Sequence, residues 1–250
     1  MSVAVALAAA TALASPVEAP PPTALAVSPA HVVLDAGGRA AVRIETRAGR
    51  RLLLRATVAG LALDLRGKPR IAAQRDAAPW LSVTPATVDV GRAGATIVIA
   101  AHRRAAARPG DHTALVLLTA TTPPTRGVAI QLRVGVAVTV RVKGRRVHRV
   151  EVTTVRARRR PPRRSVLIEL TFANRGNVIE SLGGARLQIT LLRGERVIAR
   201  LPTVRRKVLP HTAALVVVRY RGRSHGAATI RVALAAPNGR TAVRSFPLRL

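Results

Sequence analysis

The chain of 250 residues contains no cysteine and few aromatic side chains, and each absence excludes a class of structure or site. Without cysteine there is no disulfide, no thiolate zinc site, no cysteine nucleophile and no iron–sulfur cluster. Aromatic residues make up 2% of the chain, and they are Trp80, Phe172, Tyr220 and Phe246. The hydrophobic cores must therefore consist mainly of aliphatic side chains, and four rings make a poor platform for stacking nucleotide bases.

Acidic residues are also scarce, whereas arginine is abundant. The chain has 11 Asp and Glu residues against 42 Lys and Arg residues, which gives a formal net charge of +31. Lysine occurs only at Lys68, Lys143 and Lys207, so the other basic residues are all arginine. The charge indicates either a polyanionic partner or the compositional bias of a GC-rich genome, and the sequence leaves both open.

The first residues are typical of a secretory signal peptide followed by a spacer. Residues 1–15 form a short apolar run that ends in Ala12-Leu13-Ala14, a small-x-small pattern suited to signal peptidase. No Lys or Arg precedes the run, so an alanine-rich tail is the alternative. Residues 16–22 are rich in proline, which favours an extended linker. No later stretch reaches the roughly 18 apolar residues of a membrane-spanning helix. We therefore expect an extracytoplasmic mature chain without a transmembrane helix.

From Leu25 onward, apolar and polar residues alternate with a period of two. Residues 40–46, 52–58 and 134–140 follow this pattern, which is typical of β-strands with one buried face. Turn sequences such as Pro109-Gly110 separate these segments by about 8–12 residues, the spacing of a β-sandwich. No segment has the apolar periodicity of a long amphipathic helix.

A second series of strands follows a basic turn at residues 143–147. Its segments are residues 147–155, 165–174, 185–192, 196–201, 213–220, 227–235 and 241–250. Pro237-Asn238-Gly239 predicts a hairpin, because Asn238 and Gly239 tolerate the positive φ of a tight turn. The sequence thus predicts an all-β chain of two tandem immunoglobulin-like β-sandwich domains, residues 23–143 and 144–250, after a signal peptide and spacer at residues 1–22.

Several short motifs resemble one bacterial protein family. Ala78-Pro79-Trp80-Leu81-Ser82-Val83-Thr84-Pro85 is followed by Pro109-Gly110-Asp111-His112, and the second half carries Asn174-Arg175-Gly176-Asn177. In this order they resemble the WxL-interacting cell-surface proteins of Gram-positive bacteria. The resemblance implies a first domain associated with peptidoglycan and a second domain that binds a partner protein.

We interpret the residues of these motifs as core and turn positions rather than as ligand-binding groups. Trp80 lies in an alternating segment, which favours a core side chain over a sugar-stacking one. The turn positions are Gly110, Asn174, Gly176, Asn177, Asn238 and Gly239. The six histidines are scattered and no two carboxylates form an obvious pair. The sequence therefore predicts no catalytic residue, no metal site and no cofactor.

A cluster of arginines near the domain boundary is the one feature that looks like a site. Guanidinium groups bind phosphates and carboxylates in bidentate fashion, so the cluster is a candidate polyanion-binding site. Pro161-Pro162 predicts that its second part is an exposed loop or hairpin tip. The residues are Arg145, Arg146, Arg149, Arg156, Arg158, Arg159, Arg160, Arg163 and Arg164. An arginine-rich loop without a function is the alternative.

The sequence as a whole predicts a non-enzymatic binding protein that is secreted or held at the cell surface. The expected partners are an anionic cell-wall polymer (peptidoglycan or teichoic acid) and a WxL-type surface protein. Two alternatives stay open. One is a chaperone-like assembly protein that pairs an exposed edge strand with a client. The other is a polyanion or nucleic-acid binder, although the few aromatic rings and the signal peptide make nucleic acid the less expected ligand.

Overall fold

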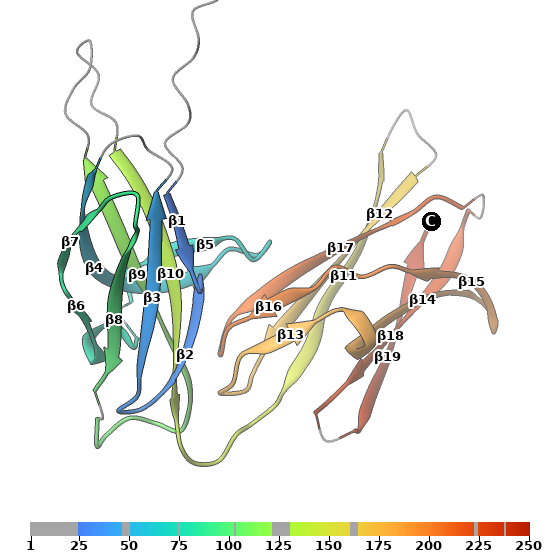
Figure 1. Cartoon of the computed structure of the whole chain (residues 1–250). Helices are drawn as coiled ribbons and strands as arrows, with labels where there is room; N and C mark the ends of the chain where they lie inside the picture. Colours follow the sequence, from blue (N-terminus) through green and yellow to red (C-terminus); the bar gives the residue numbers. More distant parts are fainter. Residues whose placement is uncertain are drawn as a thin grey trace, which may run out of the picture.

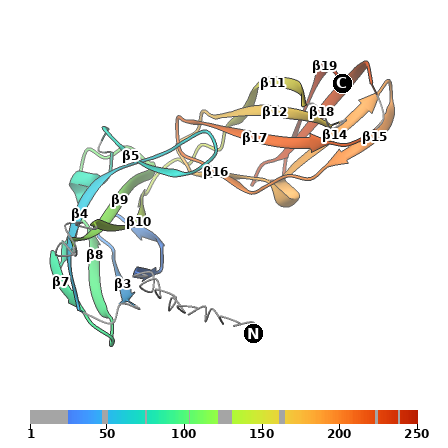
Figure 2. The same cartoon turned by 90° about the horizontal axis from the view of Figure 1, so that it is seen from above.

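The computed structural model describes residues 25–46, 51–74, 76–102, 104–121, 131–160, 165–222, 225–237 and 239–250. The predicted signal peptide and spacer at residues 1–22 lie outside these ranges. The described chain consists of β-strands and two short 3-10 helices, η1 (Ala78–Trp80) and η2 (Gly184–Arg186). None of its helices is long and apolar enough to cross a membrane. The predicted all-β fold of two immunoglobulin-like sandwiches is confirmed, and the sandwiches lie at an angle to each other (Figure 1, Figure 2).

Two sheets form the first sandwich. One has the strand order β1-β3-β8-β6, and the other has the order β2-β10-β9-β4-β5, with β7 also paired to β4. The strands are β1 (Leu25–Ser28), β2 (His31–Asp35), β3 (Arg39–Thr46), β4 (Leu52–Leu63), β5 (Pro69–Ala72), β6 (Leu81–Thr84), β7 (Thr87–Val90), β8 (Ala95–Ala101), β9 (Gly110–Thr121) and β10 (Gln131–Val142).

The first two strands of the chain belong to different sheets. β1 pairs antiparallel with β3, whereas β2 pairs parallel with β10 along residues 137–141. The chain changes sheet at Pro29, a residue with no N–H for a strand ladder. β9 pairs with β10 over the whole of β10. Within the described residues, β10 therefore has a strand on both sides only along its second half.

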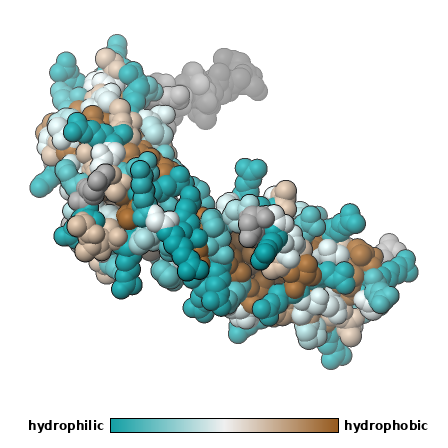
Figure 3. Space-filling model, turned by 90° about the horizontal axis from the view of Figure 1, so that it is seen from below, coloured by the Kyte–Doolittle hydropathy of each residue, from teal (hydrophilic) through white to brown (hydrophobic). Residues whose placement is uncertain are grey.

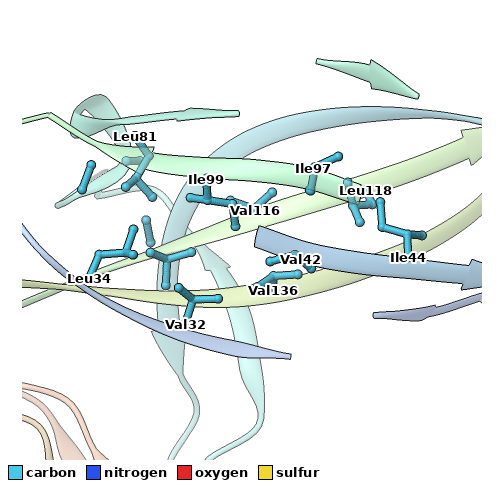
Figure 4. Close-up of a cluster of buried hydrophobic side chains, with 14 of the residues drawn as sticks. Val32, Leu34, Val42, Ile44, Leu81, Ile97, Ile99, Val116, Leu118 and Val136 are labelled. Atoms are coloured by element: carbon cyan, nitrogen blue, oxygen red, sulfur yellow. The ribbon is translucent and has the colours of Figure 1, made fainter. Parts of the chain in front are cut away.

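The core of the first sandwich follows directly from the period of two. Val42 and Ile44 of β3 and Ile97 and Ile99 of β8 point inward and expose no surface. Figure 4 shows these side chains meeting residues of β2, β9 and β10 between the two sheets. Trp80 borders this aliphatic cluster and is 8% exposed. Branched aliphatic side chains suit this arrangement, because they fill the pleated surface of each strand.

The second sandwich has sheets of order β11-β12-β17 and β15-β14-β18-β19, with β13 and β16 as a separate pair. Its core contains Phe172, Ile168, Leu170 and Ile230, which are fully buried. The strands are β11 (Val150–Arg160), β12 (Ser165–Asn174), β13 (Glu180–Leu182), β14 (Leu187–Arg193), β15 (Arg196–Leu201), β16 (Arg206–Val208), β17 (Ala213–Tyr220), β18 (Ala227–Ala235) and β19 (Thr241–Arg249).

The structure contains short strands that the sequence pattern did not predict. Each has three or four residues, too few to establish a period of two; they are β5, β7, β13 and β16.

The predicted C-terminal hairpin is formed by β18 and β19, and the Ala236 N–H donates to the Arg240 carbonyl at 2.7 Å in its turn. Gly239 has a φ of 80°, and Asn238 lies outside the described residues. The domain boundaries at residues 143 and 144 stay a prediction.

Replacing Phe172 by alanine tests whether the two cores are separate. We expect Phe172→Ala to lower the free energy of unfolding of the second sandwich by about 3–5 kcal/mol, because it leaves a large cavity. Denaturant unfolding would be followed by far-ultraviolet circular dichroism and by the fluorescence of Trp80, which reports on the first sandwich. Val217→Ala, on the exposed face of β17, is the control. An equal shift of the Trp80 transition would contradict separate cores.

Candidate functional site

The free half of β10 presents unpaired backbone groups along the edge of its sheet. The Ala137 N–H donates to the Ala30 carbonyl at 3.0 Å, on the side of β2. Because backbone groups alternate in direction along a strand, those of Gln131, Arg133 and Gly135 point to the same side. No strand of the described chain pairs with them there. This edge can accept an additional strand.

The apolar side chains of β10 become more exposed toward this free half. Val136, Val138 and Val140 expose no surface, whereas Leu132 and Val134 are only half-buried. Leu132 packs against the rim of the first core. A strand added beside the free half would therefore gain apolar contacts as well as backbone hydrogen bonds.

Positive side chains from both sandwiches lie close together near the second half of β10. His31 Nε2 is 3.1 Å from Thr139 Oγ1, which fixes the imidazole on the sheet surface. Burial lowers the pKa of His31, and the positive charges of Lys207 and Arg141 lower it further. Lys207 belongs to β16 of the second sandwich, whereas Arg141 belongs to β10. The region between the sandwiches therefore favours a negatively charged group.

Asn177 joins the two sandwiches through its side-chain amide. Its Nδ2 donates to the Pro109 carbonyl at 2.8 Å and to the Arg145 carbonyl at 2.9 Å. Its Oδ1 accepts a hydrogen bond from the Val147 N–H at 2.7 Å, and its backbone carbonyl accepts one from the Asp111 N–H at 2.8 Å. One side chain thus connects the start of β9, the connecting segment and the second sandwich.

A buried carboxylate and a glycine complete this junction. Asp111 is 7% exposed, and its Oδ2 accepts a hydrogen bond from the Ile179 N–H at 2.9 Å. Its Oδ1 lies 3.4 Å from Arg141 Nε, which compensates the buried charge. Gly110 has a φ of 133°, and a Cβ there would lie 2.3 Å from the Asn177 carbonyl oxygen. Only glycine allows the sandwiches to approach so closely.

One further hydrogen bond joins the two sandwiches, and a buried glutamate holds the connecting segment against the second sandwich. The Leu215 N–H of β17 donates to the Leu65 carbonyl at 2.6 Å, in the loop between β4 and β5. Glu180, 2% exposed, binds His148 Nδ1 at 2.7 Å and Arg186 Nη2 at 2.9 Å, which ties the connecting segment to the second sandwich. The orientation of the sandwiches is therefore determined at several separate points.

The described arginines of the predicted cluster lie in two places, the segment that connects the sandwiches and strand β11. Arg145, Arg146 and Arg149 are exposed in the connecting segment, and Arg156, Arg158 and Arg159 are exposed along β11. Hydrophilic side chains gather where the sandwiches meet (Figure 3). β11 continues to Arg160, so Arg156–Arg160 lie on a strand and not in a loop. The side chain of Arg160 and residues 163 and 164 lie outside the described residues.

The two groups of arginines are spread along the chain and are partly neutralised. At the rise of a β-strand, the ends of β11 are about 30 Å apart. Arg149 pairs with Glu151 at 2.8 Å, and Arg158 pairs with Glu169 at 3.4 Å. Among the described members of the predicted polyanion-binding cluster, the arginines of the connecting segment and those of β11 are therefore spread along the chain and do not form one compact site.

The remaining motif residues lie in the core and in turns. The buried Asn174 donates to the Val178 carbonyl at 2.8 Å and accepts a hydrogen bond from the Gly176 N–H at 2.9 Å, which builds a local turn. A Cβ on Gly176 would lie 2.0 Å from the Val147 carbonyl oxygen. The sequence indicated a turn here but not its contact with the first sandwich, because no local signal reports a partner so distant in the chain.

His112 lies in a polar pocket next to the buried tryptophan. Its Nδ1 is 2.8 Å from Asp76 Oδ1, its Nε2 is 2.8 Å from the Arg108 carbonyl, and its ring centroid is 4.6 Å from that of Trp80. The hydrogen bond to Asp76 raises the pKa of His112 above its ordinary value, against the opposing effect of burial. Asp76 also accepts a hydrogen bond from the Thr113 N–H, so it has a structural role. No cluster of three potential metal ligands occurs within the described residues.

Comparison with known proteins relates the fold to solved structures. No protein-family model matches the chain, and no curated protein is significantly similar to it. A chain from the chaperone–tip adhesin complex of CFA/I fimbriae biogenesis matches 89% of this chain over 98% of its own length, with 12% identity and a TM-score of 0.51. The YadV chaperone is 12% identical over 90% of this chain and 99% of its own, with a TM-score of 0.48. The SafB chaperone–SafA pilin complex of Salmonella enterica gives 13% identity over 91% and 96%, with a TM-score of 0.46. At these identities the likeness concerns the fold.

These comparisons correct the family resemblance drawn from the sequence. The solved chain that aligns over both sandwiches with a TM-score above 0.5 comes from a fimbrial chaperone–adhesin complex, so the resemblance to WxL-interacting proteins is wrong. The expected binding to peptidoglycan or teichoic acid and the expected WxL-type partner are wrong with it. The physical reason lies in the motif residues: Trp80, Gly110, Asn174 and Gly176 serve the core and turns of a sandwich, and such residues report the fold rather than a ligand.

Removing the Asn177 amide tests the junction. We expect Asn177→Ala to widen the range of angles between the sandwiches, because three side-chain hydrogen bonds are lost. Small-angle X-ray scattering would measure the increase in the radius of gyration. Asn177→Asp keeps the acceptor for the Val147 N–H but loses both donations, so an intermediate effect is expected. Scattering unchanged in Asn177→Ala would contradict this role.

The stability of the first sandwich should depend on pH through His112. Its pKa is raised in the folded chain, so its stabilising contribution is complete below the ordinary value of 6.5 and is lost as the pH rises through the folded-state pKa. Urea unfolding of the wild type and His112→Gln, followed by Trp80 fluorescence, would measure the difference in stability. That difference should decrease between about pH 6 and pH 8. A difference independent of pH would contradict the assignment.

Proposed function

We propose that the chain is an extracytoplasmic, non-catalytic chaperone that holds an extended segment of a client protein as an added strand on β10. The observation that carries the proposal is the half-paired edge of β10, with outward-pointing backbone groups at Gln131, Arg133 and Gly135. Backbone hydrogen bonds would supply affinity that depends little on sequence. The half-buried Leu132 and Val134 would supply selection for apolar client side chains.

The position of this edge supports the capture of an extended segment. β2 pairs with one edge of β10 from Ala137 onward. An added client strand would pair with the same edge at residues 131–135, end to end with β2. Each new backbone hydrogen bond contributes about 1 kcal/mol net, so the few bonds available here suit a reversible complex. A holding chaperone requires such reversibility.

The positive region between the sandwiches supports a client with a negatively charged group next to the captured segment. Lys207 and Arg141 both lie near enough to His31 to lower its pKa, and Arg141 already has Asp111 as an acidic partner. A client carboxylate in this region would therefore pair with Lys207 in particular. The hydrogen bonds of Asn177 at the junction would keep these charged side chains at a constant distance from the edge of β10. The similarity to a chain of a chaperone–tip adhesin complex supports the same class of function at the level of the fold.

Removing one outward N–H tests the proposal. Arg133→Pro deletes the N–H that faces the client while leaving the pairing with β9, whose hydrogen bonds involve the alternate residues. We expect client capture to weaken about five- to tenfold in Arg133→Pro, as one lost backbone hydrogen bond implies. In the control Arg133→Ala, which keeps the N–H, capture should be retained.

The measurement requires a client identified by position-specific crosslinking. A photoreactive amino acid at residue 133 of the full chain, expressed in its host, should give adducts that map to one extended segment of a secreted protein. The same probe at Arg55, on β4, is the control for nonspecific contact. A synthetic peptide of the mapped segment should then protect the amides of Arg133 and Gly135 from hydrogen exchange. Equal adducts at both positions, or no protection, would overturn the proposal.

A further inference from the structure

A pocket of about 520 Å³, lined by both polar and apolar residues, lies on the first sandwich, on the sheet opposite β10. Its centre is the outward face of β8, whose alternate residues Ile97 and Ile99 point into the core. None of the lining residues is acidic. They are Gly37, Arg39, Ser82, Thr84, Val98, Ala100, Ala101 and His102.

The strand register explains why this part of the sheet is hollow. Ala100 stands opposite Arg39 of β3 on one side and opposite Ser82 of β6 on the other. Neighbouring strands are about 4.8 Å apart, so the Cα atoms of Arg39 and Ser82 are about 10 Å apart with only a methyl group between them. A small oxyanion fits such a gap and would reach the polar groups on both sides.

The walls of the pocket are held in place by hydrogen bonds. His102 Nε2 lies 2.9 Å from Ser82 Oγ, and the His102 N–H donates to the Trp80 carbonyl at 2.7 Å. The Gly37 N–H donates to the Ala101 carbonyl at 2.9 Å. These contacts position the hydroxyl and the imidazole before any ligand arrives, which reduces the entropy lost on binding.

Arg39 is one of several exposed arginines of the first sandwich without an acidic partner among the described residues, and it is the one that lines this pocket. Arg43 binds Glu45 at 2.7 Å and Arg51 binds Asp89 at 3.1 Å. Arg39 is exposed and makes no ion pair or side-chain hydrogen bond with the described residues. Its guanidinium is therefore available for an external anion.

We propose that this pocket binds a phosphate group. Arg39 would donate two hydrogen bonds to the phosphate oxygens, the bidentate geometry that guanidinium favours. The hydroxyls of Ser82 and Thr84 would donate from β6, and the methyl group of Ala100 leaves the space that the phosphate occupies. The same chemistry could come from a free phosphate ester or from a phospholipid headgroup. The site is independent of client capture, because it lies on the other sheet.

Nuclear magnetic resonance of the full-length protein tests this site. Titration with inorganic phosphate should give saturable shifts of the Ser82, Ala100 and His102 amides. Arg39→Gln should weaken the affinity about tenfold, as expected for the loss of a charge-assisted hydrogen-bonded pair. Ser82→Ala should weaken it by a smaller factor. Arg55→Gln replaces an exposed arginine on the opposite sheet and should leave the affinity unchanged.

Binding to lipid vesicles distinguishes a phospholipid headgroup from a free phosphate ester as the source of the phosphate. Vesicles of phosphatidic acid are compared with vesicles of phosphatidylcholine. Binding of phosphatidic acid vesicles that depends on Arg39 would identify a headgroup, whereas Arg39-dependent binding of free phosphate alone would identify a soluble ester. The proposal would be overturned if the wild type shows no saturable shifts. Equal weakening by Arg39→Gln and Arg55→Gln would also overturn it, because nonspecific attraction to the positive chain would then explain the binding.

Discussion

The unequal pairing of β10 is the constraint on which the proposed activity depends. β9 satisfies one edge of this strand completely, whereas β2 covers only part of the other. The cause is the departure of the chain into the opposite sheet at Pro29, where β1 pairs with β3 instead. Unpaired backbone groups at a sheet edge recruit another strand readily. A protein that keeps such an edge must either protect it or use it.

Polar groups make directional contacts that set the relative position of the two sandwiches. The Asn177 amide and the buried Asp111 carboxylate bind backbone groups across the junction, and directional hydrogen bonds fix an angle better than nonspecific apolar contact does. Gly110 makes the approach possible. The edge of β10 and the charges of the second sandwich are thereby held in one geometry, although they belong to separate cores.

The high arginine content of the chain does not by itself locate a binding site. The chain carries a net charge of +31, yet the described residues of the predicted cluster are spread along the connecting segment and β11, and two of them have carboxylate partners. Arg39 was not part of that prediction, because nothing near it in the sequence is unusual. It stands out only when β6 and β8 are placed beside β3, because this pairing puts Arg39 and Ser82 on either side of Ala100 in one pocket.

Local patterns along the chain were enough to predict the class of fold, since a period of two over short segments separated by turns has few solutions other than packed β-sheets. It also indicated Trp80 as a core side chain and Asn174–Gly176 as a turn, which are local properties. Only the folded structure shows which strand has a free edge, which side chain of the turn contacts the other sandwich and which arginine lines a pocket. Those features depend on pairing between residues far apart in the chain, such as Asn177 and Pro109, and no local pattern encodes that pairing.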